Sequence, residues 1–479
     1  MSLTRKLAHN TAAQFVGKGI GTLLAVIALS QLFRYLGPNE YGRFHIVLTI
    51  VQFSGIIADF GLYLIVLNDI SEPRYNASKI VSQHIIFRLY LNIVYVLTMG
   101  VVALIVPYDN VLKWGIVLMS TSNVFIWFGQ IFQTVFQKHF ATYYSAISEI
   151  IGRTVLLAAT VIMIALQLPL LPLMMTVVLG SFITCVVSAI CAHKFIRISW
   201  RLDPLYIREV IFRTWPIALS IVFNLLYFKA DTIILSLYAD AYAVGIYGMP
   251  YRILETLIQL PLIIMGLFMP ILTKARAKHD EAEFRQYVQK GFDIMAFLSI
   301  PLLLGSLPLA GRIVRIVGGS GFAESAPVLQ ILMIGVVLMF FTTVFGHSVV
   351  ALHKQKTMIK YYGIIAGLML FAYLVFIPRY SYFAAAWLTV IGEVLIYAAS
   401  FYVVYRETHF IPKFGVLVKS FVSAILMSGV VYFLREWTIF FTIPFGMALY
   451  VFCVYIFRGI KKETVKEILV LKGKQGKLG

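Results

Sequence analysis

The sequence predicts an all-α polytopic membrane protein, with about fourteen transmembrane helices in two pseudo-symmetric six-helix lobes plus a terminal helix pair. Three observations predict this class. The 479 residues are 60% hydrophobic and only 13% charged. Apolar stretches long enough to cross a bilayer follow one another along almost the whole chain. Lys and Arg gather in alternate connections between these stretches, as the positive-inside rule requires.

The apolar stretches define the helices in order, and each exceeds the roughly 17 residues that a membrane-crossing helix needs. Long apolar runs without polar alternation favour helices over barrel strands, because a helix pairs its own backbone polar groups within the hydrocarbon. The predicted spans are 11–35, 42–67, 80–106, 111–136, 147–167, 170–193, 212–238, 245–272, 291–308, 325–352, 358–377, 382–404, 414–434 and 438–458.

The basic residues predict the orientation. If the N-terminus is cytoplasmic, the inner connections and tails hold roughly 28 of the Lys and Arg residues, and the even number of spans returns the C-terminus to the cytoplasm. The formal charge of +19 is then explained mainly by contacts with the inner leaflet. Nucleic acid is not an expected partner, because no soluble region is available to carry a nucleic-acid-binding module.

The connections predict the domain organisation. An N-lobe at 1–195 and a C-lobe at 212–405 are joined by a cytoplasmic loop at 196–211, and helices at 406–458 precede a basic cytoplasmic tail at 459–479. A short pattern around Gly42 (Tyr-Gly-Arg-Phe, 41–44) recurs around Gly245 (Val-Gly-Ile-Tyr, 244–247) at a corresponding place in the second half. The mixed-charge stretch 273–292 predicts a helix on the cytoplasmic surface.

Several motifs carry a family resemblance. Residues 36–42 (Leu-Gly-Pro-Asn-Glu-Tyr-Gly) are followed by 58–62 (Ala-Asp-Phe-Gly-Leu), by Trp-Phe-Gly-Gln at 127–130 with Arg153 beyond, and by Asp-Thr-Ile-Ile-Leu at 231–235. In this order the motifs resemble those of Wzx-type polysaccharide exporters, flippases of the multidrug/oligosaccharidyl-lipid/polysaccharide superfamily. Thr134 and Val135 replace small residues common after the glutamine, which leaves a specific role for Gln130 and Gln133 open.

The resemblance implies a function. It implies a prokaryotic inner-membrane flippase that moves a polyprenyl-diphosphate-linked oligosaccharide to the outer leaflet by alternating access, for O-antigen or capsule synthesis. The partners that it implies are the lipid-linked oligosaccharide, membrane lipids, H⁺ or Na⁺ as a coupling ion, and other polysaccharide-assembly proteins. It also implies structural roles in turns or helix breaks for five residues: Gly37, Pro38, Gly42, Gly61 and Gly245.

Cations within the predicted spans are candidates for binding the diphosphate. Lys18, Arg88 and Arg153 lie at similar depth in the first lobe, and Lys229 lies in the second. Charged groups at such depth tend to face a water-filled cavity, and Arg offers bidentate donors to phosphate. The alternative is that these long side chains carry their charges to the membrane interface.

Opposite charges in the seventh and eighth spans predict an internal ion pair. Asp231 and Arg252 lie at matching distances from the turn between these spans, with Lys229 and Glu255 a little further away. A structural Asp231–Arg252 salt bridge is the first interpretation, and breaking such a buried pair is costly. The alternative is an ion-sensitive cluster that couples a cation gradient to the motion of the lobes.

Two further carboxyl groups complete the set of candidates. Glu393 lies near the middle of the twelfth span with no basic residue within one turn, so it is a candidate proton carrier or a neutral group in a packed helix interface. Asp59, near Gly61, is expected to cap or stabilise a helix break.

Other functions lack the residues that they require. The glycines at 318–321 are not followed by the Lys and Ser or Thr of a phosphate-binding loop, and no metal-ligand spacing is present. The sequence therefore predicts no cofactor and no covalent catalysis. Two alternatives stay open, a cation-coupled multidrug-type antiporter and a membrane polymerase or ligase of sugars.

Overall fold

The computed structural model describes residues 3–59, 62–71, 77–199 and 203–458, and all regular structure in this part of the chain is helical. Eleven segments of it are long and apolar enough to cross a membrane. The predicted class, a multi-pass helical membrane protein, is therefore confirmed. The helices are α1 (Leu3–Asp59), α2 (Leu62–Ser71), α3 (Ala77–Ile105), α4 (Asn110–Lys138), α5 (Tyr143–Ala165), α6 (Leu170–Ala192), α7 (Pro204–Tyr238), α8 (Ala241–Leu257), α9 (Gln259–Ala277), α10 (Glu281–Gly318), α11 (Ser325–Ala351), α12 (Gln355–Thr408), α13 (Gly415–Phe433) and α14 (Ile439–Ile456), with a 3-10 turn at Ser320–Phe322.

Two of the long helices each contain two predicted spans. In α1 the break is at Gly37, whose φ is 65°, a conformation that glycine adopts without steric cost. Pro38 follows it, and its fixed φ suits the start of the next helical segment. In α12 the break is at Ser381, with φ 51°. The predicted turns at these two places are thus sharp breaks within nearly continuous helices.

Three predicted boundaries are wrong. The second span, predicted at 42–67, is divided, because α1 ends at Asp59 and α2 begins at Leu62; Gly61 lies outside the described residues. Helix α7 begins at Pro204, eight residues before the predicted span 212–238 and within the loop predicted at 196–211. Residues 273–292 do not form a separate surface helix, because the Asp280 side chain accepts a hydrogen bond from the Glu283 N–H at 2.8 Å and so caps the start of α10.

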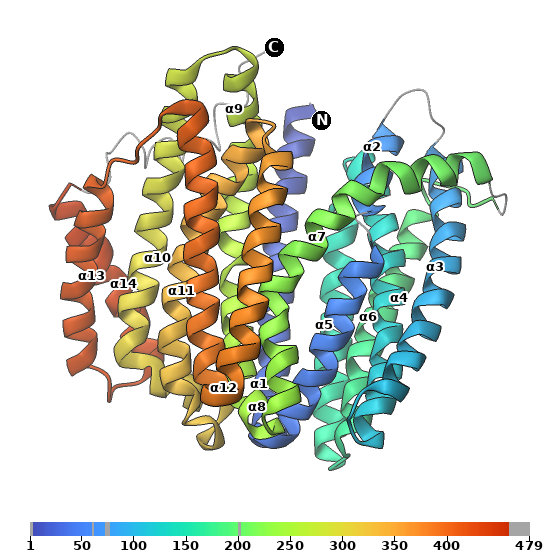
Figure 1. Cartoon of the computed structure of the whole chain (residues 1–479), viewed down its shortest axis with the longest axis horizontal. Coiled ribbons are helices and arrows are strands. Elements are labelled where there is room, and N and C mark those ends of the chain that lie inside the picture. The colour runs from blue at the N-terminus through green and yellow to red at the C-terminus, as the bar shows by residue number, and fades with distance from the viewer. Residues whose placement is uncertain (1–2, 60–61, 72–76, 200–202, 459–479) are drawn as a thin grey trace. The chain divides into compact units, whose positions relative to one another are not determined.

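The chain forms two compact units, one within Met1–Leu225 and the other within Leu226–Lys474. In the first unit α4 packs against α3, α6 and α1, and α1 packs along α5 (blue to green in Figure 1). Apolar side chains such as Val81, Ile131 and Phe136 form its core. Helices α5 and α6 approach closely where Gly152 faces Gly180.

In the second unit α11 is the central helix. It packs against α12, α10, α8 and α9, while α13 packs on α10 and α14 on α13 (yellow to red in Figure 1). Aromatic rings fill this core, for example Phe292 against Phe341, with ring centroids 4.7 Å apart. The Arg312 guanidinium of α10 donates to the carbonyl groups of Arg435 and Trp437, which fixes the turn between α13 and α14.

Candidate functional site

Two predicted cations lie along the contact between α1 and α5. The helices approach closely there because Gly17 faces Ala146 and Gly21 faces Glu149. Lys18 lies beside these glycines and is exposed. The side chain of Arg153 is 42% exposed, and its Nη2 lies 3.9 Å from Oε1 of Glu149, one turn earlier on α5. Lys18 and Arg153 are therefore accessible from the surface of the first unit.

Arg88 lies in a different environment. Its side chain is 1% exposed and forms an ion pair with Asp59, the last residue of α1. Its guanidinium carbon lies 5.6 Å from the centre of the Trp127 ring. Arg88 is buried and paired, unlike the exposed Lys18 and Arg153. Its predicted role in binding the diphosphate stays a prediction. Asp59 neutralises Arg88. It is also the last residue of α1, next to the break before α2, so its predicted role in stabilising a helix break stays a prediction.

The charges of α7 and α8 pair differently from the prediction. Glu255 binds both cations: it forms ion pairs with Lys229 of α7 and with Arg252, whose Nη1 lies 2.5 Å from Oε2. The predicted pairing of Arg252 with Asp231 is therefore wrong. Lys229 is buried, so the prediction that it is a cavity cation is also wrong. The sequence placed these charges at matching depth, but helix rotation decided which of them meet.

Asp231 is buried in a network of hydroxyl groups. It accepts hydrogen bonds from the hydroxyl groups of Tyr247 on α8 and Thr389 on α12. Thr389 precedes Glu393 by four residues, so both lie on one face of α12. Glu393 is 3% exposed and has no hydrogen-bond or ion-pair partner within the described part of the chain.

Gly42 and Gly245 are both buried, in α1 and α8. Gly245 precedes Tyr247 by two residues, next to the Asp231 network. Their proposed structural role as repeated motifs stays a prediction.

One further buried charge, that of Asp69, was not predicted from the sequence. Asp69 of α2 is 0% exposed; it accepts a hydrogen bond from Tyr206 and forms an ion pair with Arg213 at 2.8 Å. Both partners lie on α7, more than 130 residues away. No local pattern connects such distant residues, so only the fold reveals the pair.

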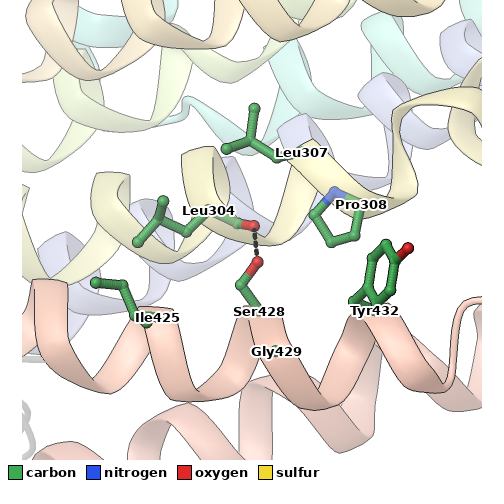
Figure 2. A pocket seen from close by; sticks show the side chains of 7 residues that line it. All are labelled: Leu304, Leu307, Pro308, Ile425, Ser428, Gly429 and Tyr432. Carbon is green, nitrogen blue, oxygen red and sulfur yellow. Dashed lines mark hydrogen bonds between the residues drawn. The ribbon is translucent and has the colours of Figure 1, made fainter.

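An apolar groove lies between α10 and α13 (Figure 2). The hydroxyl group of Ser428 in this groove already donates to the Leu304 carbonyl at 2.7 Å. No charged residue lines the groove, so it suits an apolar chain and not an anionic headgroup. Its lining residues are Leu304, Leu307, Pro308, Ile425, Ser428, Gly429 and Tyr432.

Comparison with known proteins decides the family. The family model described as "Polysaccharide biosynthesis protein" matches residues 7–276, more than half of the chain. The chain belongs to this family. Proteins similar to it include the lipopolysaccharide biosynthesis protein WzxC of Escherichia coli (strain K12), which is 24% identical over 353 residues that cover 70% of this chain and 68% of WzxC. The capsular polysaccharide biosynthesis protein CapF of Staphylococcus aureus is 23% identical over 410 residues, 84% of this chain and 100% of CapF.

Solved structures share the fold. The lipid II flippase MurJ in an inward closed conformation matches with a TM-score of 0.72 at 15% identity, over 94% of this chain and 98% of MurJ. A multidrug resistance MATE transporter of the MOP superfamily, in an inward-facing conformation, matches with a TM-score of 0.69 at 12% identity, over 81% and 94% of the two chains. The resemblance to Wzx-type exporters in the sequence is thus confirmed.

Proposed function

We propose that this protein is a flippase that moves a polyprenyl-diphosphate-linked oligosaccharide from the inner to the outer leaflet by alternating access, without covalent chemistry. The observation that carries the proposal is membership of the polysaccharide biosynthesis family, in which its relatives are named for lipopolysaccharide and capsule synthesis. The proposed location of the protein is the cytoplasmic membrane of a prokaryote, with both termini of the chain in the cytoplasm. Other polysaccharide-assembly proteins are proposed partners, since they would supply and consume the lipid-linked sugar.

Lys18 and Arg153 are the proposed first contacts for the diphosphate. Both are accessible on the first unit. The carboxylate of Glu149 lies 3.9 Å from the Arg153 guanidinium, and a guanidinium is well suited to bind phosphate oxygens. Two cations and one carboxylate together carry a net positive charge, and this charge favours a diphosphate over an organic cation.

A cation gradient is the proposed driving force, with the carboxyl groups of the second unit as its sensors. Glu393 and Asp231 are both buried, and Thr389, which lies four residues before Glu393 on α12, donates a hydrogen bond to Asp231. A buried carboxyl group strongly favours its neutral form, so binding and release of H⁺ or Na⁺ there would be coupled to the local packing. The Lys229–Glu255–Arg252 cluster is proposed as structural, because its charges already satisfy one another.

Transport in reconstituted vesicles tests the proposal. We expect a labelled polyprenyl-diphosphate oligosaccharide to cross the vesicle membrane with the wild-type protein. Transport should fall about tenfold or more in a Lys18→Gln, Arg153→Gln double variant, because each lost charged hydrogen bond costs about 1.5–3 kcal/mol. Lys274→Gln, an exposed cation on α9, is the matched control. Efflux of a cationic dye without lipid transport would instead identify an antiporter, and polymerised sugar in the vesicles would identify a polymerase.

A further inference from the structure

Buried polar side chains of α3 and α4 face one another within the first unit. The two helices are antiparallel neighbours. Asn123 of α4 donates to the Tyr95 hydroxyl group of α3 at 2.8 Å. Two helical turns before Tyr95 lies Arg88, and two turns after Asn123 lies Gln130. Arg88 and Gln130 therefore come to the same level on the facing sides of the two helices.

Asn92 lies on the same side of α3, one turn after Arg88. The ring of Trp127 of α4 lies beside Arg88, with the guanidinium carbon 5.6 Å from its centre. We call the group of Arg88, Asn92 and Gln130 the α3–α4 polar site.

The α3–α4 polar site has hydrogen-bonding groups that the described residues do not satisfy. Arg88 Nε and Nη1, both polar atoms of the Asn92 amide, and Gln130 Oε1 are buried and lack a partner in the described ranges of the chain. Arg88 is 1% exposed and Asn92 is 3% exposed. Native proteins satisfy nearly all buried polar groups, so this concentration of unmet donors and acceptors indicates a ligand.

We propose that the α3–α4 polar site binds a sugar phosphate, namely the phosphate and first sugar of the lipid-linked cargo. This inference rests on the proposed function. The unmet donors of Arg88 and the Asn92 amide suit phosphate oxygens, since hydrogen bonds between a guanidinium and phosphate are charge-assisted and strong. The unmet carbonyl oxygens of Asn92 and Gln130 accept only from donors, which the hydroxyl groups of a sugar supply and a bare anion does not.

The carboxylate of Asp59 already binds Arg88 in this site, so it would compete with the phosphate of the ligand for the guanidinium. It binds Arg88 through Nη2, and the other two nitrogens of the guanidinium have no partner among the residues that the structure describes. The side chain of Asp59 is 20% exposed, whereas that of Arg88 is 1% exposed. Asp59 thus lies between Arg88 and the surface of the unit, and an arriving phosphate would displace its carboxylate.

Binding measurements on the full chain in lipid nanodiscs test the site. The probes are a short-chain prenyl diphosphate bearing one sugar, the same prenyl diphosphate without the sugar, and free pyrophosphate. Asp59→Asn should tighten binding of all three probes about tenfold, because a competing charged group is removed. Asn92→Leu should weaken all three about tenfold or more. Gln130→Leu should weaken only the probe that carries a sugar.

Asp69→Asn is the matched control, because it breaks another buried Asp–Arg pair of the same unit and should leave probe affinity unchanged. The proposal is overturned if Asn92→Leu and Gln130→Leu bind every probe as the wild type does, or if Asp59→Asn weakens binding. If the Asp59→Asn variant does not fold, the affinities of the Asn92→Leu and Gln130→Leu variants decide whether the proposal holds. Absence of lipid transport by the wild type would refute the proposed function. The probe affinities test the α3–α4 polar site independently of transport.

Discussion

The cluster of Lys229, Glu255 and Arg252 allows a sharp prediction about stability. Glu255 is the shared partner of two cations whose side chains differ in exposure, 5% for Lys229 and 27% for Arg252. Glu255→Gln leaves Lys229 buried without its carboxylate, and removal of one partner of a buried pair costs about 3–5 kcal/mol. The Arg252 contact adds about 1 kcal/mol at most, because water screens it.

Lys229→Met should cost much less than Glu255→Gln. It removes the buried cation itself and leaves Glu255 paired with Arg252. The double variant Lys229→Met, Glu255→Gln should recover most of the loss, since replacement of a buried ion pair by apolar groups is often neutral or stabilising. A difference of about 3 kcal/mol between the two single variants corresponds to more than a hundredfold in the unfolding equilibrium constant.

Equilibrium unfolding in detergent micelles, followed by tryptophan fluorescence, measures these differences. Arg252→Gln serves as the control, because it removes the more exposed cation and keeps the Lys229–Glu255 pair. Equal losses for Glu255→Gln and Lys229→Met, or no recovery in the double variant, would refute the reasoning that Glu255 holds a buried charge in place.

Three further variants test other parts of the molecule. Glu393→Gln should abolish the dependence of lipid transport on an imposed cation gradient, which flux measurements with and without the gradient will show; unchanged dependence would remove Glu393 from the coupling proposal. Arg153→Gln alone should reduce transport less than the double variant with Lys18→Gln, because one cation remains, and full activity of both variants would exclude this site. Gly152→Ala should destabilise the first unit by about 1–3 kcal/mol, because the added Cβ would lie 2.8 Å from the Gly180 carbonyl oxygen; Gly129→Ala, with nothing within 4 Å, should show no such loss in thermal unfolding.

Helix identity and order could be read from the sequence because they depend on local chemistry. In lipid, a long apolar run must pair its backbone N–H and C=O groups within its own helix. The predicted spans 325–352, 414–434 and 438–458 therefore agree closely with α11, α13 and α14. The break at Gly37 was also visible locally, since only glycine readily takes φ 65° and Pro38 cannot continue the hydrogen bonding of a helix. The predicted helix boundaries were wrong where a polar side chain determines the helix end, as Asp280 does at the start of α10.

The partners of the buried charges could not be read in the same way. The sequence by itself determined which charges lie in apolar spans and at roughly what depth, because depth follows from the number of residues from a turn. Only the tertiary structure decided that Asp59 reaches Arg88, that Glu255 and not Asp231 binds Arg252, and that Asp69 meets Arg213. The physical reason is that a side chain's partner depends on the rotation and packing of whole helices. Those are set by many apolar contacts between distant segments, and no local pattern records them.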